Sequence, residues 1–234
     1  MTNGFTLVAE RTLETSLHQQ LKRCYAPDEA STEVVLGDYR IDAIRDDELI
    51  EIQCASLSAI RDKSQKLLAR HKLRVVKPVV WRTRIAKAKQ AGGAITSRRM
   101  SPKRGDILEV FEDLIYFTRV FPHPNLVLEV PMVQVIETRI PSKRRRGRRR
   151  KDYKVHDVGL ELIESTHEFR SVDDLLTLVN VPEGTTAFNT SDLAGWIDRP
   201  RWVAQKIAYT LKHMSAIDMV ARRRSGIIYE RKAA

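Results

Sequence analysis

One stretch of the chain, "IDAIRDDELIEIQ" from Ile41 to Gln53, constrains the fold more than any other. Apolar residues alternate on both sides of Asp46 and Asp47, which is typical of two strands joined by a two-residue turn. In that register every strand residue has a defined partner, and Asp42 lies directly opposite Glu51. Carboxylates that face each other at roughly 5 Å repel. The pattern therefore predicts a site that needs a compensating positive charge, and Asp42→Asn is expected to raise stability in metal-free buffer.

The flanking sequence predicts an ordered series of elements around this hairpin. Leu13, Leu17 and Leu21 recur at every fourth residue and indicate a helix with one apolar stripe. "TEVVL", a Gly-Asp turn and "YRIDAI" indicate a hairpin that leads into a third strand, "LIEIQCA". A helix in "SLSAIRDKSQKLLARH" and a buried strand in "LRVVKPVVW", with Pro78 near its end, follow. The predicted order is helix, three antiparallel strands, helix and strand.

Composition indicates a globular protein. With 234 residues, the chain is long enough for one large or two small domains. The N-terminus lacks a secretory pattern and no apolar stretch approaches the roughly 20 residues that a bilayer requires, so we expect a cytoplasmic protein without a membrane partner. Cys24 and Cys54 are too few for a disulfide framework and lie in apolar segments, so we expect reduced core residues.

The formal charge of +11 is concentrated in "KRRRGRRRK", which supplies eight positive charges and leaves +3 for the rest of the chain. Such a run repels itself, so it is either solvated or bound to phosphate. It falls at the tip of an expected long hairpin, 126–163, which favours nucleic acid. A loop, "TSRRMSPKRGD", adds further charge. The expected DNA contacts here are Arg98, Arg99, Lys103 and Arg104 in the loop and Lys143, Arg144, Arg145, Arg146, Arg148, Arg149, Arg150 and Lys151 at the tip.

The C-terminal part has the pattern of a winged helix. We expect helices in "ILEVFEDLIYFTRVF" and "SVDDLLTLV". We expect a further helix in "NTSDLAGWI", with Thr190 or Ser191 as its N-cap. A longer helix that buries Trp202 follows, and then a hairpin around "RRRSG". In this pattern the second helix meets a DNA groove and the wing meets the backbone, although winged helices also dock proteins. The expected DNA contacts are Arg201, Gln205, Lys212, Arg222, Arg223 and Arg224.

The acidic residues in the hairpin define a candidate metal site. Glu51 and Gln53 are two residues apart and project from one face of a strand, while Asp42 faces them from its neighbour. Hard oxygen ligands with room for water suit Mg²⁺ or Mn²⁺. Gln53 can orient a water molecule but carries no charge, so a cation is expected from Lys63, Lys66 or Lys22. His18 on the first helix could face the same cleft.

This element order, with an acid in the second strand and Glu-x-Gln in the third, resembles the PD-(D/E)XK nuclease superfamily. The resemblance implies that Asp42 and Glu51 ligate a divalent cation and that Gln53 occupies the place of the superfamily's lysine. It also implies that Glu14, on the first helix, assists. Ile41 stands where the superfamily has proline. Glutamine variants exist among restriction enzymes and competence-associated nuclease-like proteins.

A closer resemblance covers almost the whole chain. It is to an uncharacterised family of bacterial proteins that carries "SLHQQLK", "LIEIQ", "SPKRG", "HPNLVLEV" and "SDLAGWIDRPRWVAQKIAYTLKHM". Lys77 in "VKPV" stands where that family is expected to have histidine. This second resemblance implies no established activity.

These observations predict an α/β protein in two parts: a PD-(D/E)XK-like, restriction-endonuclease-like domain over 1–165 and a winged-helix domain over 166–234. The expected function is that of a Mg²⁺-dependent (or Mn²⁺-dependent) DNA endonuclease in DNA repair, recombination or defence, associated with the nucleoid. A homodimer is the state that would cut both strands. One alternative is a catalytically inactive DNA-binding protein with a nuclease-like fold. A second is a module that contacts RNA or an acidic protein.

Overall fold

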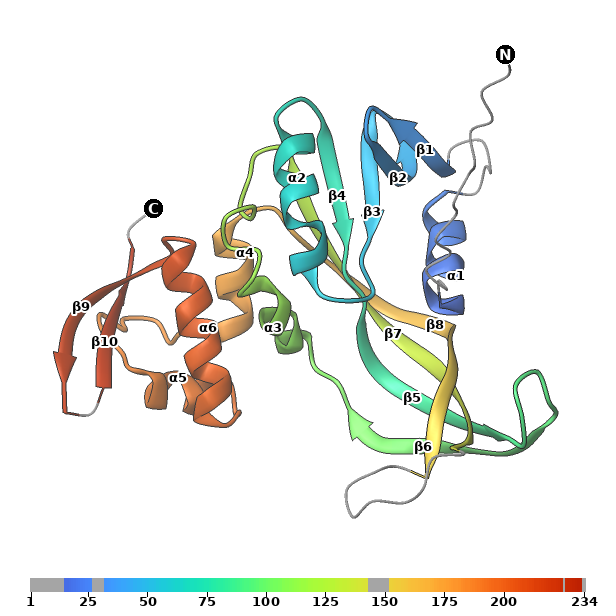
Figure 1. Ribbon diagram of the computed structural model, residues 1–234. Coiled ribbons are helices and arrows are strands. Elements are labelled where there is room, and N and C mark those ends of the chain that lie inside the picture. Colours follow the sequence, from blue (N-terminus) through green and yellow to red (C-terminus); the bar gives the residue numbers. More distant parts are fainter. Residues whose placement is uncertain (1–14, 27–31, 143–151, 225, 233–234) are drawn as a thin grey trace.

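The computed structural model describes residues 15–26, 32–142, 152–224 and 226–232 (Figure 1). It is a mixed α/β structure with one eight-stranded sheet, helices on both faces of that sheet, and a small two-stranded sheet near the C-terminus. Among the helices described, none is long and apolar enough to cross a membrane.

The N-terminal half follows the predicted order. Its elements are α1 (Ser16–Tyr25), β1 (Thr32–Leu36), β2 (Tyr39–Arg45), β3 (Glu48–Ile52), the 3₁₀ turn η2 (Leu57–Ile60), α2 (Arg61–Leu68) and β4 (Lys72–Val76). The strands β1, β2 and β3 pair antiparallel, and β4 joins β3 in parallel because α2 carries the chain back across the sheet.

The predicted hairpin register is confirmed as far as Ala43. Arg45 pairs with Glu48 and Ala43 with Ile50. Asp46 and Asp47 both have positive φ angles, 47° and 63°, which is the backbone of the two-residue turn that matches strand twist. The turn thus decides which residues of β2 and β3 face each other.

The rest of the sheet is built along one long strand. β7 (Leu126–Pro141) pairs in parallel with β4 near its start and with β5 (Val79–Ala88) further on, while β8 (Tyr153–Phe169) runs antiparallel along its other edge. Pro78 therefore separates two strands and does not lie near the end of one. The segment expected as a basic loop is instead a strand, β6 (Ile95–Arg104), because it pairs with β5 in a hairpin.

The two faces of the sheet carry separate cores. Ile50, Ile52 and Val76 pack on one face with Leu17 and Leu21 of α1, as the predicted stripe requires. Alternate residues, Leu49, Leu73 and Val75, pack on the opposite face with Leu67 and Leu68 of α2. We call these the α1 face and the α2 face. Figure 1 shows the two helices on either side of β3 and β4.

The α2 face continues into the C-terminal part without a break. Its remaining elements are η3 (Ile107–Val110), α3 (Phe111–Leu114), α4 (Val172–Leu176), η4 (Thr177–Val179), α5 (Thr190–Trp196), α6 (Arg201–His213), β9 (Ile217–Arg223) and β10 (Gly226–Arg231). One apolar cluster contains Val130 of the sheet, Leu175 of α4 and Ile207 of α6. The expected domain boundary after residue 165 falls inside β8, which ends at Phe169.

Several local expectations are wrong. The N-cap of α5 is Asn189, in place of Thr190 or Ser191, because its side chain accepts both first-turn amides, from Ser191 and Asp192. The helix expected over 107–121 ends at Leu114. Trp202 is 53% exposed, since Ala204, Ile207 and Leu211 supply the buried stripe of α6. Cys24 is exposed and Cys54 half-buried, so neither is a core residue; both are free thiols.

A close backbone contact generates a prediction about Gly105, which follows β6. Its amide donates to the Trp81 carbonyl at 3.0 Å, and an added Cβ would lie 2.0 Å from the Val80 carbonyl oxygen. Gly105→Ala is therefore expected to lower the free energy of unfolding by about 2 kcal/mol or more, measured by urea denaturation. Gly195→Ala in α5, where nothing lies within 4 Å of the added Cβ, is the control and should raise it by about 0.5 kcal/mol. Equal effects of the two substitutions would contradict this account.

Candidate functional site

Three carboxylates form a row across neighbouring strands. Glu33 of β1 lies between Thr32 and Val34, which pair with Ala43 and Ile41 on either side of Asp42 of β2. Glu51 of β3 lies near enough to Asp42 for the Asp42 charge to act on it. Their side chains are progressively more buried, with exposed fractions of 29%, 16% and 6%. We call these three residues the acidic row. Glu33 was missed in the sequence, although counting outward from the Gly37-Asp38 turn of the first hairpin reaches it.

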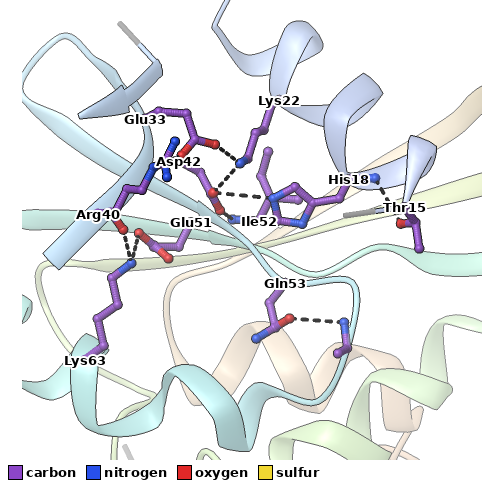
Figure 2. A network of polar contacts seen from close by, with 11 residues as sticks. Thr15, His18, Lys22, Glu33, Arg40, Asp42, Glu51, Ile52, Gln53 and Lys63 are labelled. Atoms are coloured by element: carbon purple, nitrogen blue, oxygen red, sulfur yellow. Dashed lines mark hydrogen bonds and ion pairs between the residues drawn. The ribbon is translucent and has the colours of Figure 1, made fainter. Parts of the chain in front are cut away.

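The carboxylate of Asp42 is held mainly from α1 (Figure 2). Lys22 Nζ lies 2.9 Å from Asp42 Oδ1, His18 Nε2 lies 3.4 Å from the same oxygen, and the amide of Ile52 donates to Oδ2 at 2.8 Å. Lys22 also contacts Glu33, which in turn pairs with Arg40. The expectation that His18 faces this site is confirmed.

These contacts shift the pKa values of Asp42 and His18. Burial alone would raise the pKa of Asp42, but hydrogen bonds from His18, the Ile52 amide and Lys22 outweigh it and lower the pKa to about 2. Burial likewise opposes a charge on His18, yet hydrogen bonds to Asp42 and Cys54 raise its pKa to about 9. Asp42 and His18 are therefore both charged at neutral pH.

The carboxylate of Glu51 is held from α2. Lys63 Nζ lies 2.5 Å from Glu51 Oε1 and donates to the Arg40 carbonyl oxygen at 2.5 Å (Figure 2). Burial raises the pKa of Glu51 to about 7; the ion pair with Lys63 works against this shift and the charge of Asp42 adds to it. Two neighbouring carboxylates thus have pKa values moved in opposite directions.

The expected one-sided convergence of Asp42, Glu51 and Gln53 is wrong in two respects. Asp42 and Glu51 are adjacent in the row, but the first contacts α1 and the second contacts α2, on opposite faces of the sheet. Figure 2 shows the Gln53 carboxamide directed away from Asp42. The Gln53 side chain points this way because Gln53 lies just beyond the end of β3 and its Oε1 accepts a hydrogen bond from the Ala55 amide at 3.1 Å.

A buried lysine holds the segment that follows Gln53. Lys77 Nζ donates to the Ala55 carbonyl at 2.6 Å and pairs with Asp113 at 2.9 Å. Asp113 also accepts the amide of Leu57 at 3.2 Å. Lys77 therefore connects the segment after β3 to α3. This contact also positions Ala55, whose amide donates to the Gln53 side chain.

Of the lysines expected to supply positive charge, Lys22 and Lys63 reach the acidic row, and Lys66 lies exposed on α2 one turn beyond Lys63. Glu14, expected as the acid on the first helix, lies outside the described residues.

The acidic row offers the type of donor that Mg²⁺ or Mn²⁺ requires. Such ions bind in proteins through one or two carboxylates and fill their remaining positions with water and substrate phosphate. Asp42 and Glu51 fit this requirement in chemistry and number, whereas Gln53 adds nothing to it. Across the described parts of the chain, no group of three or more His, Cys, Asp or Glu side chains could hold a metal ion.

Those expected DNA-binding residues that the structure describes lie on three exposed surfaces. The β5–β6 hairpin, Val79 to Arg104, contains eight basic residues and no acidic one. It extends beside the β7–β8 hairpin at the end of the sheet remote from α2 (Figure 1). The residues Lys143–Lys151 lie outside the described part of the chain. Exposed side chains at the other expected positions are Arg98, Arg99, Lys103 and Arg104 on β6, Arg201, Gln205 and Lys212 on α6, and Arg222, Arg223 and Arg224 around the β9–β10 turn.

Comparison with known proteins identifies a family. Residues 15–170, more than half of the chain, match the family model described as Domain of unknown function (DUF8091). The chain belongs to this family, whose match covers α1 to β8 and stops before α4. It is also similar to an uncharacterized protein of Treponema pallidum (strain Nichols), at 28% identity over 184 residues, which cover 77% of this chain and 71% of the relative. No solved structure matches.

The opposite pKa shifts predict opposite effects of two conservative substitutions. Asp42→Asn is expected to lower the free energy of unfolding at pH 7 by about 2 kcal/mol, because the folded state stabilises the Asp42 charge. Since the pKa falls from 3.8 to about 2, this stabilisation is present above pH 3.8 and is lost as the pH falls toward 2. The stability gain expected from the sequence is therefore reversed, because Lys22 and His18 already offset the repulsion.

Glu51→Gln should instead stabilise the protein in metal-free buffer. The pKa of Glu51 rises from 4.5 to about 7 on folding, so ionising the wild-type residue costs stability as the pH rises through that interval. At pH 8 the variant is expected to gain up to about 3 kcal/mol relative to the wild type, with the gain vanishing near pH 4. Urea denaturation of both variants across pH 4 to 8 measures this, and effects of the same sign would contradict it.

Proposed function

We propose that this protein binds DNA and hydrolyses phosphodiester bonds at the acidic row with a divalent cation. The observation that carries this proposal is a pair of carboxylates on adjacent strands, the half-buried Asp42 and the buried Glu51, whose pKa values are moved in opposite directions. Supporting it, the element order α1–β1–β2–β3–α2–β4, with β4 parallel to β3, is that of a restriction-endonuclease-like core.

The side chains around the acidic row have separable roles in this proposal. Asp42 and Glu51 are the residues that would hold Mg²⁺ or Mn²⁺, and such an ion would supply a water molecule of lowered pKa and polarise the scissile phosphate. Lys63, 2.5 Å from Glu51, brings the positive charge that the superfamily's lysine supplies from the position of Gln53. Lys22 and His18 hold Asp42 ionised. Glu51, with a pKa of about 7, can accept a proton near neutral pH.

The basic surfaces supply the DNA-binding part of the proposal. Lysine and arginine contacts to phosphate give affinity without reading sequence, and the acid-free β5–β6 hairpin is suited to that task. The run α5, α6, β9 and β10, with arginines at the turn of its hairpin, is consistent with a winged helix that meets DNA. We place the protein, on this proposal, at the nucleoid in DNA repair, recombination or defence, where a homodimer could cut both strands.

A catalytically inactive DNA-binding protein is the second candidate, and a specific observation favours it. Each acid is already neutralised by a lysine, Asp42 by Lys22 and Glu51 by Lys63, and the two carboxylates contact opposite faces of the sheet. In that case the acidic row stabilises the fold and the same basic surfaces bind DNA without cleavage.

Cleavage assays separate the two candidates. With Mg²⁺ or Mn²⁺ and a panel of duplex, branched and single-stranded DNA, the wild type should nick at least one substrate. Asp42→Asn should reduce the rate by about 100-fold or more while DNA affinity persists, because it removes one ligand charge. Lys63→Ala should also slow cleavage, whereas Lys66→Ala, one turn along the same helix, is the control and should not. A wild type that binds but never cuts would establish the inactive alternative.

The arginine run should determine how strongly DNA binding depends on salt. Each phosphate contact contributes roughly 0.9 to the slope of log affinity against log salt on duplex DNA. Replacing Arg144, Arg145, Arg146, Arg148, Arg149 and Arg150 with serine should therefore flatten that slope by several units, as measured by fluorescence anisotropy at increasing salt. Arg70→Ser, beside α2 and remote from the hairpins, is the control. Any preference of the six-residue variant for one DNA structure should survive. An unaltered salt slope in this variant would show that the DNA-binding surface lies elsewhere.

A further inference from the structure

The outer side of α6 carries two aromatic side chains that do not contribute to the core. Trp202 is 53% exposed and Tyr209 is 46% exposed. They are seven residues apart, so they lie on one face of the helix about 10.5 Å from each other along its axis. Large aromatic rings are usually buried, because they dominate core and interface energetics. Two of them on one exposed face indicate a surface that binds something.

The charges around these rings favour an anionic ligand. Lys206 Nζ lies 4.9 Å from the centroid of the Trp202 ring, and the Tyr209 and His213 rings are 4.2 Å apart. The sequence of α6, "RWVAQKIAYTLKH", contains no acidic residue. Rings interleaved with cations suit a nucleic acid, because stacking on bases and contact with phosphate occur together. An acidic peptide would pair with the basic side chains but not stack on the rings, and an apolar peptide would contact the rings but not the basic side chains.

The aromatic face of α6 is continuous with the basic β5–β6 hairpin. Trp202 lines a groove of about 400 Å³ that is also lined by Lys103 and Arg104 at the end of β6. Acidic side chains are also present in this groove. Asp106 pairs with Arg199, Glu112 pairs with Lys206 at 3.1 Å, and burial raises the pKa of Glu109. The groove therefore links α6 to the basic hairpin without a large uncompensated negative charge.

We infer that the outer face of α6 binds a single-stranded segment of DNA, with Trp202 and Tyr209 each stacking on an unpaired base. In duplex DNA both faces of a base are covered by its neighbours, so exposed rings find partners only where bases are unpaired. Lys206 lies between the two rings along the helix and Lys212 lies about one turn beyond Tyr209, so both are placed to contact phosphates of the bound strand. This inference rests on the proposed DNA-binding function and assigns it a substrate class: DNA with single-stranded or branched segments.

The first test compares two probes, an oligothymidine strand and a duplex with the same number of phosphates, by fluorescence anisotropy. Trp202→Ala and Tyr209→Ala should each weaken binding of the single strand by about 5- to 150-fold, the loss of one stacked base. Binding of the duplex should change little. Lys212→Ala, on the same helix, is the matched control and should weaken both probes alike, because it removes only a phosphate contact.

The second measurement reports directly on Trp202 and does not depend on affinity. Addition of oligothymidine should quench the fluorescence of the wild type. Trp202→Phe should keep most of the affinity, since a ring that can stack remains, but lose the quenching. Trp196→Phe is the control and should keep the quenching, because Trp196 packs against Phe188 at 5.3 Å between ring centroids. Melting temperatures should be unchanged in the Trp202 variants, whose side chain lies outside the core.

The outcomes distinguish this inference from the proposed function. Equal loss on both probes, or no loss on either, overturns the α6 inference while leaving DNA binding intact. If Trp202→Ala instead converts a dimer to a monomer in sedimentation velocity, the face is a contact between two copies and the inference is wrong. Selective loss on the single strand without any Mg²⁺- or Mn²⁺-dependent cleavage supports the inference and contradicts the proposed catalysis. A wild type that binds neither probe contradicts both.

Discussion

Backbone pairing along β7 is the constraint on which the rest of the structure depends. The first part of β7 pairs with β4 and so carries the three-stranded antiparallel unit that contains the acidic row. Its later part pairs with β5, and β8 pairs along its other edge from Leu128 to Pro141. Because both halves of the sheet attach to one 16-residue strand, the acidic row and the basic hairpins are held at opposite ends of a single body. The proposed catalytic site and the proposed DNA-binding surface therefore have a defined separation.

Charge is distributed on this frame in two different ways. Within the sheet, ionised groups are paired: Arg74 on the α1 face contacts Glu48 at 2.7 Å and Glu168 at 2.6 Å and also pairs with Glu129, which accepts the Tyr25 hydroxyl. Buried ions need such partners, because an unpaired one carries a large desolvation cost. The β5–β6 hairpin, by contrast, has no acidic residue of its own, and its arginines and lysines on β6 lie exposed. A fold whose surface, and not its interior, is to bind a polyanion needs its interior charges paired and an excess of positive charge on that surface.

The acidic row combines structural and chemical properties in the same atoms. Lys22 and Lys63 stabilise Asp42 and Glu51 in the folded state, and the same lysines are the cations nearest to any phosphate that reaches the row. Burial of Glu51, together with the charge of Asp42, raises the pKa of Glu51 to about 7 against the effect of Lys63, so the protonation of the row changes near neutral pH. Because the same carboxylates affect the stability of the fold and are proposed to take part in cleavage, a variant of Asp42 or Glu51 needs both its stability and its cleavage rate measured.

The sequence by itself determined the local geometry of the hairpin. Two aspartates between alternating apolar residues dictate a two-residue turn, which fixes the pairing of β2 with β3 as far as Ala43 and Ile50. Counting outward from the first turn likewise reaches Glu33, between the paired residues Thr32 and Val34. It also determined the stripe of α1 and the order of the first elements, because these follow from periodicity within short segments. Only the tertiary structure decided which helix each carboxylate contacts, where the Gln53 carboxamide points, and that the "SPKRG" segment pairs as β6. These features arise from contacts between residues far apart in the chain, such as Lys77 with Asp113, and local sequence does not encode them. The exposure of Trp202 belongs with them, since a helix with apolar residues on more than one face buries whichever face the rest of the fold covers.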